Sequence, residues 1–133
     1  MKDKKIREFC EKNNIKLLVV FGSSASEKTR SASDIDVAVK FRSGRIISKL
    51  NLIYKLDDLF NGKPIDLVIL TADTDPLLLY EIFFGGKPLY EEHSGIFYNE
   101  KLRAWKLYID TERLRSMRKT YLKEFARKIK NVA

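Results

Sequence analysis

The stretch FGSSASEKTRSASDIDVAV, residues 21–39, allows two interpretations that imply different folds. From Gly22 to Thr29 it matches a P-loop, the glycine-rich turn that wraps the phosphates of ATP, at every defined position except one. A P-loop needs a glycine where this chain has Glu27, and it must run directly into a helix. Only residues 30–33 separate Thr29 from two aspartates and the next predicted strand, which leaves no room for a helix. The P-loop interpretation is therefore rejected.

The second interpretation places a glycine-containing turn before two aspartates on a strand. Residues 34–41, DIDVAVKF, alternate between polar and apolar side chains, which is typical of a half-buried strand. Because successive strand residues point to opposite faces, Asp34 and Asp36 are expected on one face while Ile35 and Val37 anchor the other. The two carboxylates should therefore project together.

A third aspartate completes a candidate metal site. Asp66 lies within residues 64–70, PIDLVIL, which predict a strand of the same local pattern. If the two strands are neighbours, Asp34, Asp36 and Asp66 converge, and their charges repel unless a cation intervenes. Mg²⁺ prefers such oxygen ligands. Two ions about 4 Å apart can clamp the attacking and leaving oxygens of a phosphoryl transfer.

Gly22 and Ser23 suit the phosphates that such a site would require. Glycine permits close approach of the backbone, and a serine hydroxyl with neighbouring N–H groups can bind a triphosphate. The plainer alternative is that Ser33–Asp34 is an ordinary turn and that an aspartate close to Pro64 faces solvent. The complete pattern, with both strands and the Gly–Ser turn, is more specific than any of its parts.

The remaining pattern predicts the order α-β-β-α-β-α-β-α. Helices are expected over residues 3–13, 45–60 and 76–84 and from about 94 onward, and strands over 15–21, 34–41, 64–70 and 87–91. In the second helix Ile46, Leu50, Ile53 and Leu56 recur at helical steps. Asp75 and Pro76 suit the N-cap and first position of the third helix. The 12-residue loop 22–33 lets the first two strands pair without the crossover that a parallel pair needs.

The bulk properties point to one globular domain over residues 1–133. No apolar stretch reaches the roughly 20 residues of a membrane span, and the charged start has no signal-peptide core, so a cytoplasmic protein is expected. Cys10 is the one cysteine and is expected on the apolar side of the first helix. His93 is the one histidine and is expected in a solvated loop. One cysteine and one histidine are too few for a Cys/His zinc site. The six tyrosines are expected in the core or at its boundary: Tyr54, Tyr80, Tyr90, Tyr98, Tyr108 and Tyr121.

The whole net charge of +8 sits on the C-terminal segment. Residues 101–133 carry 11 Lys/Arg against three acidic residues, whereas residues 1–100 are balanced. An apolar stripe runs along the predicted helix of residues 94–133: Leu102, Trp105, Ile109, Leu114, Met117, Tyr121, Phe125 and Ile129. Asp110–Thr111 suggests either a kink or a new N-cap. Either the stripe packs on the domain's own sheet, or the helix overhangs the core and offers it to a partner or a second copy. The charge suits an acidic protein surface or RNA.

These motifs together resemble the DNA polymerase β-type nucleotidyltransferase superfamily, and within it the minimal nucleotidyltransferase (MNT) antitoxin branch. The matching segments are Phe21–Ser23, Ser33–Val39 and Ile65–Val68, and the helical remainder with Leu107–Asp110 fits in length and order. The resemblance implies an α+β nucleotidyltransferase fold: a small mixed β-sheet flanked by helices, here with a long basic C-terminal helix.

The resemblance also implies a reaction. A nucleoside monophosphate would pass from an NTP, here AMP from ATP, to a hydroxyl, with release of pyrophosphate. By this resemblance Asp34 and Asp36 would hold two Mg²⁺ ions, Asp66 would complete the site and help to deprotonate the acceptor, and Gly22 and Ser23 would hold phosphate. The implied acceptor is a tyrosine of a HEPN-domain toxin encoded next to the antitoxin.

One motif departs from that branch. MNT proteins commonly continue Gly-Ser-x-Ala-Arg-Gly, whereas this chain has Ser26 and Glu27 in place of the arginine and second glycine. Lys28 and Arg30 are the candidates to supply the missing positive charge to the nucleotide. Two other functions stay open: a non-catalytic module of this fold that neutralises a partner by contact, and nucleotide transfer to RNA ends.

Overall fold

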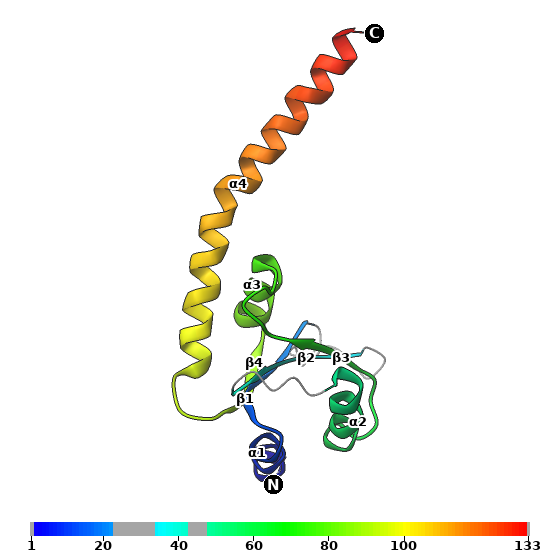
Figure 1. The fold of residues 1–133 in the computed structure, drawn as a ribbon, viewed down its shortest axis with the longest axis vertical. Coiled ribbons are helices and arrows are strands. Elements are labelled where there is room, and N and C mark those ends of the chain that lie inside the picture. The colour runs from blue at the N-terminus through cyan, green and yellow to red at the C-terminus, as the bar shows by residue number, and fades with distance from the viewer. Residues whose placement is uncertain (1, 23–33, 43–47, 133) are drawn as a thin grey trace.

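The computed structural model describes residues 2–22, 34–42 and 48–132 (Figure 1). Its elements follow the predicted order α-β-β-α-β-α-β-α. Their bounds are Lys2–Lys12 (α1), Ile15–Phe21 (β1), Ile35–Phe41 (β2), Lys49–Leu59 (α2), Ile65–Ile69 (β3), Pro76–Gly85 (α3), Lys87–Glu91 (β4) and Ile96–Val132 (α4). No helix in these ranges combines the length and the apolar composition that crossing a membrane requires.

The described strands form a mixed sheet of order β3-β2-β1-β4. β1 pairs antiparallel with β2 and with β4, whereas β2 pairs parallel with β3. The antiparallel β1–β2 pair confirms the expectation from the short connection between them. The parallel β2–β3 pair is joined through α2, the kind of crossover that parallel strands need. The predicted α+β class is therefore confirmed.

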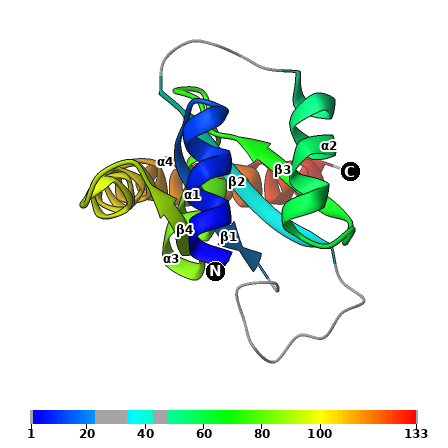
Figure 2. The same cartoon turned by 90° about the horizontal axis from the view of Figure 1, so that it is seen from below.

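The sheet separates two apolar cores. α1 and α2 cover one face, and α3 and α4 cover the other (Figures 1 and 2). In the first core Val37 of β2 packs with Leu56 of α2 and with Cys10 of α1, as expected for that cysteine. In the second core Ala38, the next residue of β2, packs with Leu79 of α3. Alternation along β2 thus sends neighbouring side chains into different cores.

α3 begins where the sequence predicts. Asp75 is the N-cap residue and Pro76 follows in the first turn, but the Asp75 side chain makes no capping hydrogen bond. The fixed backbone of proline therefore favours this start more than the aspartate does. At the other end, a Cβ on Gly86 would lie 2.2 Å from the Ile82 carbonyl oxygen and 2.9 Å from Val19 Cγ1. Glycine at this position lets the end of α3 pack closely on β1.

α4 is an unbroken helix of 37 residues whose first half packs on the fold. Ile96 and Ala104 are buried in the second core, and Lys40 of β2 pairs with Glu100 of the helix. Figure 1 shows the second half extending away from the sheet and the other helices. The side chains of residues 116–130 are all exposed. The overhang considered from the sequence is therefore confirmed.

The interpretation that α4 packs its whole apolar stripe on its own sheet is wrong. The stripe residues are between 42% and 65% exposed: Leu102, Trp105, Ile109, Leu114, Met117, Tyr121, Phe125 and Ile129. Helical periodicity identifies the apolar face of a helix, but it does not show where the core beneath that face ends.

The helix is also continuous through Asp110–Thr111, so no new N-cap forms there. Instead the Thr111 hydroxyl donates back into its own helix, 2.9 Å from the Leu107 carbonyl oxygen and 3.2 Å from that of Tyr108. Such back-bonding often bends helices. Figure 1 shows α4 changing direction in its middle.

A column of stacked groups ties α3 to α4. The ring of Tyr80 lies 4.4 Å from that of Phe84 and 4.2 Å from that of Tyr108 of α4, measured between centroids. Cations close both ends: Lys101 Nζ lies 4.9 Å from the Phe84 ring centroid and the Arg115 guanidinium 4.7 Å from that of Tyr108. These contacts, each worth roughly 0.5–1.5 kcal/mol, hold the direction in which α4 leaves the fold.

Two further expectations need correction. In α2 the buried side chains are Leu52 and Leu56, whereas Leu50 is 79% exposed, so the predicted face is displaced; Ile46 lies outside the described residues. Among the tyrosines, Tyr90 is buried as expected, but three are 62–82% exposed: Tyr54, Tyr98 and Tyr121. The surplus of apolar side chains on α2 and α4 exceeds the area that this small sheet can cover.

Candidate functional site

Two of the three predicted aspartates lie side by side on the sheet. In the parallel β2–β3 pair, Asp36 is directly opposite Asp66. The residues before them, Ile35 and Ile65, are also paired, and both pack against the first core. Both strands thus turn an isoleucine to one face and an aspartate to the other. The prediction that the two strands are neighbours is confirmed.

Asp34 comes immediately before β2 and is exposed. The backbone hydrogen bond from Ile35 N–H to the Pro64 carbonyl oxygen, 2.8 Å long, continues the β2–β3 ladder up to this point. Asp34 therefore lies at the start of the same strand pair. Its charge acts on Asp36, as the pKa of Asp36 shows.

Gly22 approaches the aspartates from β1. Phe21, the last residue of β1, is paired with Asp36, and Gly22 follows with a φ of +66°. A Cβ built on Gly22 would lie 2.4 Å from Asp36 Oδ2, closer than real contacts allow. Both the backbone conformation and the space therefore require glycine here. The other predicted nucleotide-binding residues lie outside the described residues: Ser23, Lys28 and Arg30.

The electrostatics of the site centre on Asp36. Its pKa is raised, first by burial of the carboxyl and then by the nearby charges of Asp66, Glu81 and Asp34. A hydrogen bond with the Asp66 side chain raises it further. Four acidic residues from three segments therefore act on one another across the face of the sheet that α3 covers.

Glu81 is a member of this group that the sequence reasoning missed. It is exposed and is the one charged residue in α3, whose sequence PLLLYEIFFG is otherwise apolar apart from Tyr80 and the terminal glycine. That isolation was a usable signal, because a lone carboxylate on an apolar helix needs either solvent or a cation. What the sequence does not reveal is that α3 packs against β1, which brings Glu81 toward Asp36.

The donor set suits a hard cation. Within the described ranges, no three His, Cys, Asp or Glu side chains are arranged to hold a metal ion between them. Asp36 and Asp66 are nevertheless paired, and the pKa of Asp36 is raised by burial and then by repulsion from the surrounding carboxylates. Mg²⁺ is commonly bound through one or two carboxylates, with water and substrate phosphates filling its other positions. The aspartate pair fits that mode of binding, whereas a preassembled three-carboxylate cage is not present among the described side chains.

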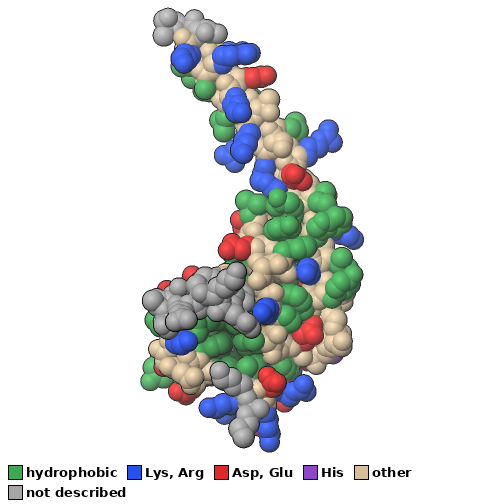
Figure 3. Space-filling model, turned by 180° about the vertical axis from the view of Figure 1, so that it is seen from behind, with side chains coloured by type: hydrophobic (Ala, Val, Ile, Leu, Met, Phe, Trp, Pro, Cys, Tyr) green, Lys and Arg blue, Asp and Glu red, His purple; other side chains and the backbone are tan. Residues whose placement is uncertain are grey.

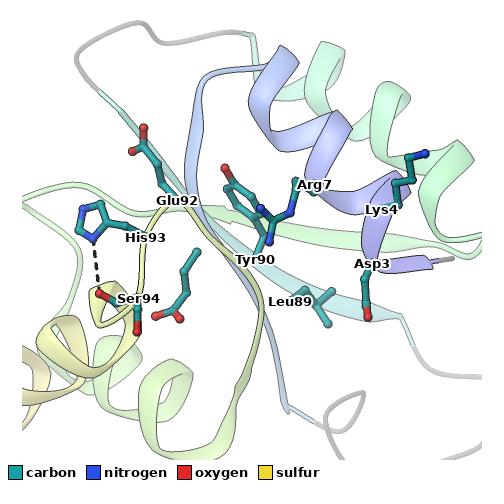
Figure 4. Close-up of a pocket in the computed structure, with 9 residues that line it drawn as sticks. Asp3, Lys4, Arg7, Leu89, Tyr90, Glu92, His93 and Ser94 are labelled. Atoms are coloured by element: carbon teal, nitrogen blue, oxygen red, sulfur yellow. Dashed lines mark hydrogen bonds between the residues drawn. The ribbon is translucent and has the colours of Figure 1, made fainter.

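A separate pocket lies between α1 and β4 (Figure 4). Its volume is about 730 Å³. Charged side chains of both signs line it, together with neutral ones: Asp3, Lys4, Arg7, Glu91 and Glu92, with His93, Ser94, Leu89 and Tyr90. β4 is the edge strand farthest from β3 in the sheet, so this pocket is not part of the aspartate site. His93 is exposed, as expected, and its Nδ1 lies 3.5 Å from the Ser94 carbonyl oxygen.

Comparison with known proteins agrees with this geometry. Residues 4–94 match the family model described as "Polymerase beta, Nucleotidyltransferase". That segment contains the four described strands and the residues of the aspartate site, and it ends just before α4. Comparison with curated proteins gives no match.

Solved structures show the same fold. A chain of a toxin–antitoxin complex with AMP-PNP is 22% identical, with a TM-score of 0.70 over 95% of this chain and 99% of its own. A chain from the tri-AMPylated Shewanella oneidensis HEPN toxin in complex with its MNT antitoxin is 23% identical, with a TM-score of 0.61 over 94% and 96%. A chain of the MntA–HepT toxin–antitoxin pair is also 23% identical, with a TM-score of 0.61 over 94% and 97%. The nucleotidyltransferase fold is therefore established for the chain.

Proposed function

The chain belongs to the polymerase β nucleotidyltransferase family, and from that premise we propose that it transfers AMP from ATP to a hydroxyl group of a protein partner. The observation that carries this proposal is the in-register pair of Asp36 and Asp66, with Gly22 packed against Asp36. A carboxylate pair beside a glycine that admits close backbone approach is the arrangement that a metal-assisted phosphoryl transfer requires.

The chain's own residues would divide the work. Asp36 and Asp66 would hold Mg²⁺, with Asp34 as a third carboxylate at the start of β2. When bound, the cation neutralises charge that develops on the phosphoryl oxygens. Gly22 leaves room for the triphosphate beside β1, and Ser23, Lys28 and Arg30 remain the predicted contacts to its phosphates.

In the transfer step the acceptor oxygen forms a bond to the α-phosphorus of ATP. The bond from that phosphorus to the oxygen bridging to the β-phosphate breaks, and pyrophosphate leaves. The acceptor proton goes to a carboxylate, for which Asp66 is the candidate because its side chain is exposed to an incoming hydroxyl. We propose that the protein acts in the cytoplasm, because the reaction consumes ATP.

For the acceptor we propose a tyrosine of a HEPN-domain toxin encoded beside this chain, which would act as its antitoxin. The fold is shared with chains of structures described as toxin–antitoxin pairs, one of them with an AMPylated HEPN toxin. At 20–23% identity this likeness supports the proposal through the shared fold.

The test is covalent transfer of label from ATP to the neighbouring HEPN protein in the presence of Mg²⁺. Asp34→Asn/Asp36→Asn should lower the rate by about 100-fold or more, because it removes two of the carboxylates that would hold Mg²⁺ at the phosphoryl group. Asp73→Asn, an exposed aspartate in the turn after β3, is the matched control and should leave the rate unchanged. Transfer that survives the double substitution would refute the metal-dependent mechanism.

A second candidate is a non-catalytic module of the same fold that neutralises its partner by contact. The exposed apolar side chains of α4 favour it, because they offer a large binding surface that does not depend on nucleotide transfer. Neutralisation of the toxin that persists in Asp34→Asn/Asp36→Asn would support this candidate. Label appearing on added RNA rather than on protein would point to transfer to RNA ends.

A further inference from the structure

The second half of α4 continues the buried face of its first half. An α-helix has 3.6 residues per turn, so residues 18 apart point in the same direction after five turns. Ile96 and Ala104, which are 4% and 1% exposed, correspond in this way to Leu114 and Leu122, which are 65% and 54% exposed. The helix therefore repeats a core-facing surface at a place where the described residues provide no core.

Six apolar side chains make up this surface, which we call the distal stripe: Leu114, Met117, Tyr121, Leu122, Phe125 and Ile129. All are more than half exposed, and the rings of Tyr121 and Phe125 stack with centroids 6.3 Å apart. Their spacing of three and four residues keeps them on one side of the helix. A helix that presents such a face to water needs another surface to cover it.

The charge around the stripe restricts what can cover it. Residues 113–130 contain eight Lys/Arg and one acidic residue, Glu124. Arg118 and Lys128 fall on the face of the stripe itself, three or four residues from its apolar members. Figure 3 shows basic side chains on both edges of this extension, with apolar ones between them. A second copy of the chain would bring like charges together, so self-association along the stripe is disfavoured.

We propose that the distal stripe is the docking surface for an acidic protein partner, which covers it with an apolar face bordered by Asp and Glu. RNA would satisfy the charge, but four of the six side chains are aliphatic and give bases nothing to stack on. A protein face satisfies both features: its apolar residues cover the stripe while its carboxylates meet Arg118 and Lys128. The inference rests on the proposed function in one respect, because the HEPN toxin is the expected occupant.

Docking there separates the binding of the partner from the chemistry. The distal stripe shares no residue with the aspartate site, which lies on β2 and β3. Substitutions in the stripe should therefore leave nucleotide binding unchanged, and substitutions of the aspartates should leave partner binding unchanged.

The experiment measures the dissociation constant of the full-length chain for the HEPN protein encoded beside it. Tyr121→Glu/Phe125→Glu should weaken binding at least tenfold, because it places two charges on the central aromatic contacts. Ser116→Glu/Thr120→Glu is the matched control: it adds the same two charges to exposed positions on the opposite side of the same helix. This control should change the dissociation constant less than threefold, and binding of a fluorescent ATP analogue should be equal in both variants.

Each result either supports or overturns the docking surface. Unchanged binding in the stripe variant overturns the docking surface, as does an equal loss in the control or a wild-type chain that does not bind the HEPN protein. Loss of single-stranded RNA binding in the stripe variant without loss of protein binding also overturns it. If the wild-type chain binds the toxin but never labels it, the proposed chemistry fails and the docking surface stands. If the stripe variant binds and labels the toxin like the wild type, the docking surface fails and the chemistry stands.

Discussion

The aspartate site and the distal half of α4 are built in opposite ways. The site combines Gly22, which follows β1, with Asp36 of β2, Asp66 of β3 and Glu81 of α3. It exists only while those elements are packed together. The distal half of α4 is a single helix whose side chains point into solvent. The site is acidic, whereas the extension is strongly basic. Damage to the core should therefore abolish the first and spare the second.

The largest expected difference between the two regions is in stability. Leu56→Ala removes a fully buried side chain that packs beneath β2 and β3, and it should lower the free energy of unfolding by about 2–5 kcal/mol. Leu122→Ala makes the same chemical change on the extension and should lower it by less than about 0.5 kcal/mol. Urea unfolding of both variants measures the contrast. Equal losses would mean that the extension is buried in solution.

Gly22→Ala should destabilise the fold by about 1–3 kcal/mol and slow transfer, because its Cβ would displace the carboxyl of Asp36. Gly62→Ala is a close control: Gly62 has a φ of +75°, yet a Cβ there would meet nothing within 4 Å. Alanine at Gly62 therefore introduces only the backbone strain. The difference in transfer rate between the two variants isolates the contact with Asp36, and equal rates would contradict that contact.

Tyr108→Leu tests the link between the two regions. It should lower the free energy of unfolding by about 1 kcal/mol, because it removes the stack on Tyr80 and the contact with the Arg115 guanidinium. Tyr98→Leu, at an exposed position earlier in the same helix, should change it by less than about 0.5 kcal/mol. Thermal unfolding gives both values, and a neutral Tyr108→Leu would show that the column does not anchor α4.

The smallest effect concerns pH. The folded-state pKa of Asp36 is raised by burial and by Asp66, Glu81 and Asp34, so the folded chain holds its proton more tightly than the unfolded chain. Stability should therefore fall as pH rises from the unfolded pKa of about 3.9 through the raised folded pKa, and then level off. With EDTA present, Asp36→Asn should abolish the loss of stability with rising pH. At neutral pH it should raise the free energy of unfolding by less than about 1 kcal/mol, since the group is partly solvated. Asp73→Asn should leave the pH dependence intact.

Much of the fold follows from local patterns. The alternation in DIDVAVKF and PIDLVIL indicated both strands and the face that carries each aspartate. The register that places Asp36 opposite Asp66 comes from the structure. The short loop after β1 indicated its antiparallel partner. These features are decided by periodicity and connection length, which a single sequence displays.

Other features depend on contacts between distant segments. Nothing local to α3 reveals that Glu81 faces Asp36, because that follows from how α3 docks on β1. Ile96 and Leu114 occupy equivalent positions on α4, yet one is buried and the other exposed. Leu50 and Leu52 differ in the same way on α2. Sequence periodicity describes a face, whereas burial depends on what the rest of the fold places against it.

For a partner docked on the distal stripe as proposed, the five-turn offset along α4 has a consequence for the size of the acceptor. A helix rises 1.5 Å per residue, so Leu122 lies about 27 Å along the axis from Ala104, where the helix is still buried against the core. A free amino acid or a short peptide held at Leu122 cannot span that length. A folded domain of about 100 residues, with a radius of gyration near 13 Å, can. Under the proposed docking, the length of α4 therefore favours a macromolecular acceptor over a small molecule.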